Sequence, residues 1–431
     1  MDDMIGKTRV SELHEIEEGR EVIVEGWVYT VASLGTITFI RLRDSSGIAQ
    51  VIVKPGSPTK CDPSVLKNLG RESSIIVTGT IRKDKRAPGG FEILASELKV
   101  IGESPKDFPI RKGISARVLG DYRHLYLRSK RLTQILRARS ELLKVFRQWF
   151  NEKGYEEVSC PSIITAAVEG GATLFELKYF DKKAYLTQSS QFYLEAAIFS
   201  LEKVFTLQPS FRAEPSKTPR HLTEYWHLEM EAAWMNLADL MKFEEEMLVE
   251  VSGMLKESMG KRSPSITQPL KAFESPFERI RYEEALQLLD KKGIRTEWGK
   301  DLGADEEKAL CSMFDKPIFL SHYPIETRAF YHKPDPSDPR VVLSHDVLVG
   351  GVGEVIGGGE RISDYNELVA RIQRYGYDPK DYSWYTDLRK YGSVPHAGFG
   401  LGIERLLAHV MGLPNIRLAI PFPRTRARIF P

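Results

Sequence analysis

The stretch that most constrains the fold of this chain runs from Phe211 to Trp234 and reads FRAEPSKTPRHLTEYWHLEMEAAW. With the preceding residues, KVFTLQPS, it predicts two strands joined by a short loop. Because strand side chains alternate between two faces, we expect Arg212 and Glu214 to share one face of the first strand. In the second strand, alternation separates the polar set Thr223, Tyr225, His227, Glu229 and Glu231 from the apolar set Trp226, Leu228 and Met230. One face is therefore expected to pack in the core and the other to carry chemistry.

The loop between these strands, residues 215–220, combines two prolines with a lysine and an arginine and is followed by His221. Such a stiff cationic turn beside Arg212 suits a polyanion such as a triphosphate, because guanidinium groups form charge-assisted bonds to phosphate oxygens. Tyr225 offers a ring on which a base can stack. A surface hairpin whose charges only contact water is the alternative interpretation.

FRAE, a loop and RHLTEYWHLEMEAAW together resemble motif 2 of the class II aminoacyl-tRNA synthetases, in the subgroup specific for aspartate and asparagine. Companion motifs occur elsewhere, so the resemblance covers essentially the full length and is strongest to the archaeal asparagine-specific branch. GFGLGIERL is similar to motif 3: Gly400 and Gly402 precede a predicted helix that carries Arg405 near its N-terminus, where phosphate is favoured. The resemblance implies an α+β chain whose catalytic domain is an antiparallel β-sheet flanked by helices.

The first quarter of the chain predicts a small all-β domain. Five strand-like runs between Glu21 and Ile101 are separated by turn residues, with one short helical piece at 63–69. Five short strands in about 85 residues favour a closed Greek-key barrel of the OB-fold type. We therefore predict an OB-fold domain at 1–103, a proline-containing linker at 104–130 and a catalytic domain at 131–431.

In the run TITFIRLRD, Phe39, Arg41 and Arg43 alternate to one side of a predicted strand. An unpaired base can stack on such a ring while the cations meet phosphate, although Phe39 could equally belong to the barrel core. The resemblance implies that this domain reads the tRNA anticodon, with Phe39 stacking on a base and Gln50 contacting one. The family usually has arginine before the first hairpin glycine, where this chain has TVASLG. Part of the contact with phosphates or bases is therefore expected from Arg82, Lys83, Lys85 and Arg86.

Apolar residues recur at helical spacing across RLTQILRARSELLKVFRQWFNEKG, with Ser129 placed to cap the start and Gly154 to end the helix. A strand over YEEVSCPSI is expected to follow. This pair resembles motif 1, which builds the dimer interface of the class and implies a homodimer. An ordinary packed helix explains the periodicity equally well.

The resemblance also assigns the substrate contacts. For ATP these are Arg212, Glu214, Arg220, His221, Tyr225, Glu354 and Arg405, of which Arg212 and Arg405 are catalytic. For the amino acid they are Glu169 in a mobile loop, Ser189, Gln191, Arg212, Glu229 and Arg361. Glu354, with Asp346 as a second acid, is expected to bind Mg²⁺, which prefers oxygen ligands.

The implied reaction activates an amino acid with ATP and transfers it to tRNA. Asparagine and aspartate are nearly isosteric, so the site must separate them by charge. Arg361 donating to the side-chain oxygen and Glu229 accepting from the amide favour asparagine, and Leu194 stands where aspartate enzymes carry a lysine. The alternatives are an aspartyl-tRNA synthetase, either discriminating or non-discriminating, an ATP-dependent asparagine-synthesising paralogue, and a nucleic-acid-binding or regulatory protein that kept the fold and lost catalysis.

The composition sets further limits. Lys and Arg total 61 against 59 Asp and Glu, so tRNA binding must rest on a local basic surface. The 3 cysteines are far apart and fit neither a disulfide framework nor a zinc site. No run of about 18 apolar residues occurs, which predicts a soluble, cytoplasmic protein without a membrane segment. The charged stretches DLGADEEKAL and ERIRYEEALQLLDKKG predict exposed helices.

Overall fold

The computed structural model describes residues 6–54, 63–111, 113–168, 173–214, 220–262 and 270–431. Contacts divide the chain into two compact units, Met1–Tyr122 and Arg123–Pro431. Their boundary falls inside the segment predicted as a linker, which contains the short helices α2 (Ala116–Asp121) and α3 (Arg123–Tyr126). Among the helices in these ranges, none is long and apolar enough to cross a membrane.

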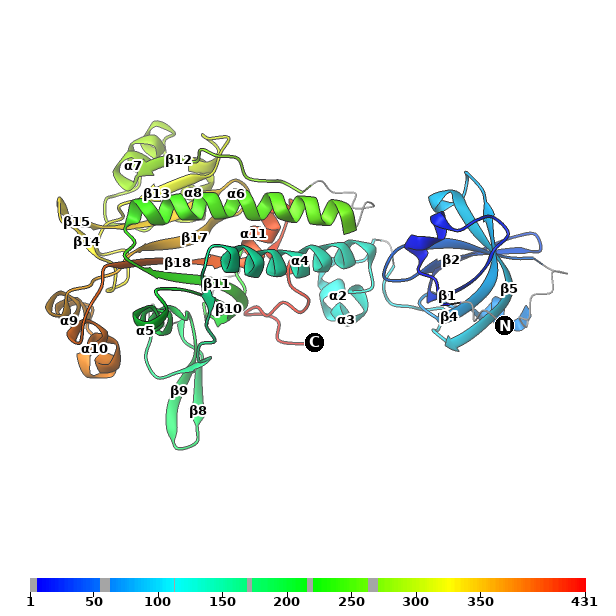
Figure 1. Ribbon diagram of the computed structural model, residues 1–431, viewed down its shortest axis with the longest axis horizontal. Coiled ribbons are helices and arrows are strands. Elements are labelled where there is room, and N and C mark those ends of the chain that lie inside the picture. The colour runs from blue at the N-terminus through cyan, green and yellow to red at the C-terminus, as the bar shows by residue number, and fades with distance from the viewer. Residues whose placement is uncertain (1–5, 55–62, 112, 169–172, 215–219, 263–269) are drawn as a thin grey trace. The chain divides into compact units, whose positions relative to one another are not determined.

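The first unit contains the predicted five-stranded barrel (Figure 1). Its strands close in the order β1-β2-β3-β5-β4, and only β3 and β5 pair in parallel. The short helix α1 (Pro63–Asn68) occupies the predicted place before β4. The strands are β1 (Glu21–Leu34), β2 (Ile37–Arg43), β3 (Ile48–Val53), β4 (Ser74–Lys83) and β5 (Phe91–Gly102).

Alternation along β2 decides which side chains fill the barrel. Ile40 and Leu42 are fully buried in the apolar core. Phe39, Arg41 and Arg43 have the opposite phase, so they lie on the outer face of the strand, with Arg41 exposed. Phe39 is therefore outside the barrel core, and the core alternative for this residue is wrong.

The second unit is built on an eight-stranded sheet in the order β12-β13-β16-β17-β18-β11-β10-β6. The central pairs are antiparallel, as predicted, whereas the outer pairs β12·β13 and β10·β6 are parallel. The strands are β6 (Glu156–Glu157), β10 (Lys203–Phe211), β11 (Glu224–Ala233), β12 (Glu278–Arg281), β13 (Ile318–Ser321), β16 (Ser344–Val349), β17 (Gly353–Glu360) and β18 (His396–Gly402).

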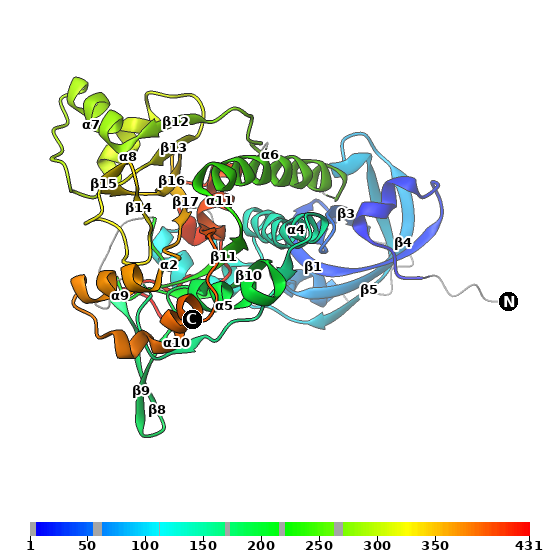
Figure 2. The ribbon, with the colours of Figure 1, turned by 60° about the vertical axis from the view of Figure 1, so that its left-hand side comes forward.

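Two long helices, α4 (Lys130–Glu152) and α6 (Leu237–Arg262), lie side by side along one face of this sheet (Figures 1 and 2). Leu228 and Met230 of β11 are buried in the core cluster that these helices complete. The predicted assignment of the apolar face of this strand to the core is therefore confirmed. The opposite face of the sheet is free to carry polar groups.

The ends of α4 follow the prediction. Ser129 Oγ accepts from the Leu132 N–H, and Gly154 has a φ of 75°, which favours glycine after a helix. The predicted strand over YEEVSCPSI is too long. Only β6 joins the main sheet, because the Cys160 N–H donates to the Gln208 side chain and β7 (Ile163–Ile164) pairs elsewhere.

The remaining elements border the sheet. Strands β7, β8 (Glu176–Tyr179) and β9 (Lys182–Leu186) form a small separate sheet. The helices are α5 (Gln191–Leu201), α7 (Tyr282–Lys291), α8 (Ala304–Cys311), α9 (Tyr365–Arg374), α10 (Ser383–Lys390) and α11 (Ile403–Val410), and a two-stranded ribbon joins β14 (Pro334–Asp335) to β15 (Asp338–Val342).

Candidate active site

Three glycines of β18, Gly398, Gly400 and Gly402, lie beside the polar face of β11 and are called the glycine floor below. His227, Glu229 and Glu231 are buried on this face, and each pairs across the sheet with a glycine of β18, in the order Gly402, Gly400 and Gly398. A Cβ atom on Gly400 would lie 2.4 Å from His227 Nε2, so this position has no space for a side chain. The glycines therefore let the side chains of His227 and Glu231 lie close against the β18 backbone.

Arg212 and Glu214 lie beyond the end of β10, which stops at Phe211. The prediction that they share a strand face is wrong, because only the Arg212 N–H continues the ladder, by donating to the Thr223 carbonyl. Their side chains still converge: Arg212 Nη1 is 3.9 Å from Glu214 Oε1. The Arg212 guanidinium also lies 5.8 Å from the centre of the Tyr225 ring.

A cavity of about 80 Å³ opens beside these groups. It is lined by every residue predicted to bind ATP: Arg212, Glu214, Arg220, His221, Tyr225, Glu354 and Arg405. Arg405 Nη1 donates to both the carbonyl oxygen and Oε2 of Glu354, at 2.8 Å and 2.9 Å. Burial lowers the pKa of His221, Arg405 lowers it further and Glu214 opposes the shift. The structure thus gathers the carboxylates of Glu214 and Glu354 and several basic groups around a space open to an anion.

Glu307 of α8 holds one of these cations and was not predicted to do so. Arg220 Nη1 donates to Glu307 Oε2 at 2.7 Å and to the Val352 carbonyl at 2.9 Å. The Glu354 N–H donates to the same Glu307 oxygen. The expectation that α8 is merely an exposed charged helix is therefore wrong for Glu307, whose side chain turns inward.

Asp346 and Glu354 form an acidic pair at the border of the cavity. A Cβ atom on Gly357 would lie 3.2 Å from Glu354 Oε1 and 3.3 Å from Asp346 Oδ1, so the two oxygens bracket this glycine. Asp346 Oδ2 accepts from Arg328 at 2.5 Å, whereas Oδ1 has no hydrogen-bond partner among the described residues. Burial raises the pKa of Asp346 to about 6. Burial acts on Glu354 in the same direction, but Arg405 and Arg212 outweigh it and lower its pKa to about 2.

A second cavity, of about 440 Å³, adjoins the first, and Arg212 and Glu354 line both. Its walls include five of the residues predicted to bind the amino acid: Ser189, Gln191, Arg212, Glu229 and Arg361. The sixth, Glu169, lies outside the described residues. Asp346, the second predicted metal ligand, also lines this cavity. The structure therefore places two predicted substrate sites side by side with Arg212 between them.

Glu229 is held in place by the start of α5. Its Oε2 accepts from the Ser190 N–H at 2.8 Å, and its Oε1 accepts from Ser189 Oγ. His227 Nδ1 lies 3.4 Å from Oε2. The carboxylate faces the cavity without being paired to Arg361.

Arg361 is paired instead with Glu231, to which the sequence analysis gave no role. Arg361 Nη2 and Nε donate to Glu231 Oε1 at 2.6 Å and 3.1 Å, and both side chains are buried. The signal was present, since Glu231 belongs to the same alternating set as Glu229. Leu194 lines neither cavity, because it packs in an apolar cluster with Ile198 and Val204.

The outer face of the barrel has its own polar network. Gln50 Nε2 donates to Glu92 Oε2 at 3.0 Å, and Arg82 pairs with the other oxygen of this carboxylate. Arg86 pairs with Asp84, so two of the predicted replacement cations are already engaged by acids. Their neighbours Lys83 and Lys85 belong to the same segment.

On the same outer face as Phe39, but further along the strands, β1 adds an aromatic residue that the sequence analysis overlooked. Trp27 is 42% exposed and lies 5.2 Å from the Arg43 guanidinium, which also donates to Glu72. Trp27 pairs with Arg43 across β1 and β2. The face therefore presents two aromatic rings, together with the exposed Arg41.

Comparison with known proteins defines the class. Residues 115–426 match the family "tRNA synthetases class II (D, K and N)", and residues 22–101 match an OB-fold nucleic acid binding domain. The chain therefore belongs to the class II aminoacyl-tRNA synthetases. It is 51% identical to the asparagine–tRNA ligase of Pyrococcus abyssi, over 99% of this chain and 100% of the relative.

Solved structures of synthetases from this class have the same fold as this chain. The asparaginyl-tRNA synthetase of Pyrococcus horikoshii in complex with asparaginyl-adenylate has a TM-score of 0.93 and 49% identity, covering 99% of this chain and 100% of that one. The aspartyl-tRNA synthetase of Entamoeba histolytica has a TM-score of 0.85 and 26% identity, and the match covers 100% of this chain and 94% of that one. The chain thus shares its fold with both proteins, while its sequence identity is higher to the asparaginyl-tRNA synthetase.

Proposed function

We propose that this chain is an asparaginyl-tRNA synthetase, which converts asparagine and ATP to asparaginyl-adenylate and transfers the asparaginyl group to tRNA(Asn). The observation that carries this proposal is the presence of Arg361 and Glu229 in the wall of one cavity. A side-chain amide supplies an acceptor to the guanidinium and a donor to the carboxylate. The high identity to asparagine-specific relatives supports the same substrate.

In the first step the asparagine carboxylate attacks the α-phosphate of ATP and pyrophosphate leaves. Arg212 lines both cavities, so its guanidinium can neutralise charge where the carboxylate and the α-phosphate meet. Arg405, Arg220 and His221 would hold the outer phosphates. Catalysis then consists of positioning and charge neutralisation, and no protein nucleophile is needed.

The adenine and the amino-acid backbone need further contacts. Tyr225 would stack on the adenine ring and Glu214 would accept from its amino group, since both line the smaller cavity. Ser189 and Gln191 line the larger cavity and would hold the substrate ammonium group, together with Glu169. This arrangement aligns the substrate carboxylate with Arg212.

Mg²⁺ fits the acidic pair at the cavity border. Glu354 and Asp346 offer the oxygen ligands that this ion prefers, and the buried Oδ1 of Asp346 has no partner among the described residues. These two residues would hold the ion. When bound, it would offset charge on the ATP phosphates.

The second step needs tRNA, whose terminal ribose hydroxyl attacks the activated carbonyl. We place anticodon recognition on Phe39 and Gln50 of the barrel, within an OB-fold domain at 1–103 that a linker at 104–130 joins to a catalytic domain at 131–431. We also propose a homodimer, supported by the likeness of α4 and β6 to motif 1. The apolar stripe of α4 is buried within its own chain, so other surfaces must contribute to that interface.

Phe39→Ala should weaken tRNA binding and leave adenylate formation intact, because Phe39 lies on the outer face of the barrel. A stacked base contributes about 1 to 3 kcal/mol, so the KM for tRNA should rise roughly 5- to 150-fold in an aminoacylation assay. Ile40→Ala is the matched control. Ile40 is fully buried, so its loss should lower stability by about 2 to 5 kcal/mol. An equal loss of adenylate formation in Phe39→Ala would contradict this role.

ATP–pyrophosphate exchange tests the proposed function directly. Asparagine should sustain exchange without tRNA, and aspartate should sustain it only weakly. Equal use of both amino acids would establish an aspartyl or non-discriminating enzyme instead. Formation of free asparagine from aspartate, ATP and ammonia, without any charging of tRNA, would establish the asparagine-synthesising alternative.

A further inference from the structure

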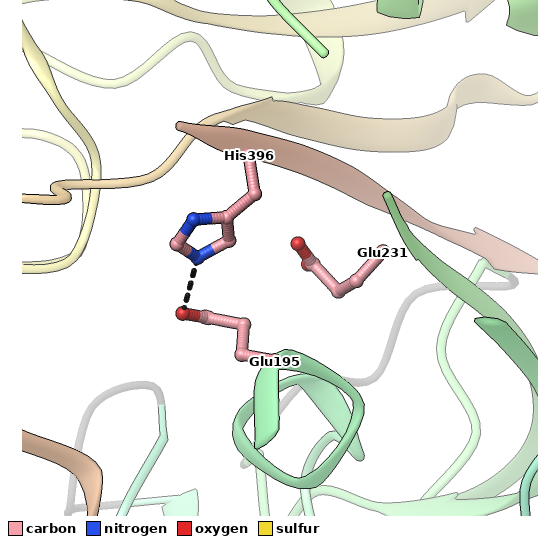
Figure 3. Close-up of side chains that lie close together, drawn as sticks. All are labelled: Glu195, Glu231 and His396. Carbon is pink, nitrogen blue, oxygen red and sulfur yellow. Dashed lines mark hydrogen bonds and ion pairs between the residues drawn. The ribbon is translucent and has the colours of Figure 1, made fainter. Parts of the chain in front are cut away.

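A second layer of charged side chains lies behind the amino-acid cavity, and Figure 3 shows three residues at this place, Glu195, Glu231 and His396, close together. Its centre is Glu195 of α5, which is fully buried. Glu195 Oε2 accepts from the Tyr385 hydroxyl at 2.8 Å and from Arg389 Nη2, and it lies 2.9 Å from His396 Nε2. The side chains of Glu195, Arg389 and His396 have no exposed surface.

This layer touches both walls of the cavity. Glu195 Oε1 accepts from Gln191 Nε2 at 2.9 Å, and Gln191 lines the cavity. On the other wall, the Arg361 N–H donates to the His396 carbonyl at 3.0 Å. Arg389 Nε donates at 2.9 Å to the carbonyl of Ile362, the residue that follows Arg361.

The carboxylates of the two layers are neighbours. Ligand atoms of Glu195, Glu231 and His396 all lie within 4.8 Å of one another (Figure 3). Burial alone would raise the pKa of Glu195, but Arg389 and His396 outweigh it and lower the pKa, which keeps this group ionised. A negative charge is therefore held close to Glu231, which pairs with Arg361 in the cavity wall.

Two carboxylates and a histidine this close together could also be the ligands of a metal ion. The guanidinium of Arg361 already donates to Glu231 Oε1, and the guanidinium of Arg389 already donates to Glu195 Oε2. A cation placed between these carboxylates would face two buried positive charges and lose its ligands to them. The geometry therefore describes a layer of ion pairs.

We propose that Glu195 is a specificity-determining positioning residue: its charge cancels that of Arg389 behind the amino-acid cavity, so that the cavity does not favour an anionic substrate side chain. This inference rests on the proposed preference for asparagine. The two candidate substrates differ in side-chain charge while having nearly the same shape. Buried charges are screened weakly, so a group that never touches the substrate still acts on that difference.

The substitution Glu195→Gln isolates the charge. Glutamine keeps an oxygen that can accept from Gln191, while the positive charge of Arg389 loses its partner. The ratio of kcat/KM for asparagine to that for aspartate should fall by about tenfold or more, mainly through better use of aspartate. The KM for ATP should stay unchanged, because Glu195 does not line the smaller cavity.

Two more variants separate charge from structure. Glu195→Gln combined with Arg389→Gln removes both charges and should return the ratio towards the wild-type value. Arg389→Gln alone leaves the negative charge in excess, so the ratio should rise. Glu245→Gln is the matched control, since Glu245 of α6 pairs with Arg279 and lines neither cavity.

The ratio of kcat/KM for asparagine to that for aspartate in these variants tests the proposed role of Glu195. An unchanged ratio in folded Glu195→Gln protein, or a double variant that stays as permissive as the single one, would overturn the inference. If Glu195→Gln does not fold, a ratio in Arg389→Gln that is unchanged or lower would overturn it equally. Equal use of aspartate by the wild-type protein is a different result, because it removes the proposed function itself.

Discussion

Arg212→Ala and Arg405→Ala should each reduce adenylate formation by roughly 100- to 1,000-fold, which is the usual effect of losing one preorganised charge contact to a transition state. The expectation for Arg212 follows from its place between the two cavities. That for Arg405 follows from its bonds to Glu354, which hold the guanidinium at the cavity that would receive the phosphates. ATP–pyrophosphate exchange with asparagine measures both effects without tRNA.

A surface arginine provides the control for these variants. Arg295 is 93% exposed at its side chain and lines neither cavity, so Arg295→Ala should retain full exchange activity. Thermal unfolding of all three variants shows whether the fold survives the substitution. Near-wild-type exchange in Arg212→Ala or Arg405→Ala would remove these residues from the catalytic site.

Glu229→Gln should reduce the use of asparagine and narrow the gap to aspartate. In the wild-type protein a substrate carboxylate would face the Glu229 carboxylate as a like charge. At about 4 Å and an effective dielectric near 20, this repulsion is on the order of 4 kcal/mol, close to a thousandfold preference. The glutamine keeps one acceptor for the serines at the start of α5. The substitution should therefore mainly reduce the discrimination between asparagine and aspartate.

The measurement is kcat/KM for both amino acids in the wild-type and variant proteins. Glu224→Gln is the matched control: Glu224 belongs to the same strand but lines neither cavity. An unchanged ratio in Glu229→Gln would show that its carboxylate never meets the substrate side chain. A simultaneous loss of discrimination in the control would point to a general disturbance of β11.

Local patterns in the sequence predicted the parts of this structure that follow from local geometry. Alternation along β11 separated Leu228 and Met230, which are buried in the core, from Glu229 and Glu231, which line the cavity. The same rule failed to end β10 correctly, since the strand stops before Arg212. Arg212 nevertheless lines both cavities, and its N–H donates to the Thr223 carbonyl.

The contacts that the sequence analysis missed join residues far apart in the chain. Arg361 and Glu231 are 130 positions apart, and Arg389 lies 194 positions from Glu195. Periodicity shows which face a side chain occupies, but it contains no information about a partner on another element. Glu195 was harder still to find, because a helix of mostly apolar residues gives no sign that one acid will be buried against an arginine.

The glycine floor also has a consequence for the resistance of the protein to heat. Gly400 of β18 also pairs with Gly357 of β17, and both line the larger cavity, so this part of the sheet lacks cross-strand side-chain contacts where the amino acid would lie. Glycine within a strand adds no packing and costs conformational entropy, which leaves this region weak when empty. A ligand that fills the floor and binds only the folded chain adds about 2.7 kcal/mol of stability at a hundred times its dissociation constant. The melting temperature of this protein should therefore depend on how much asparagine and ATP surrounds it.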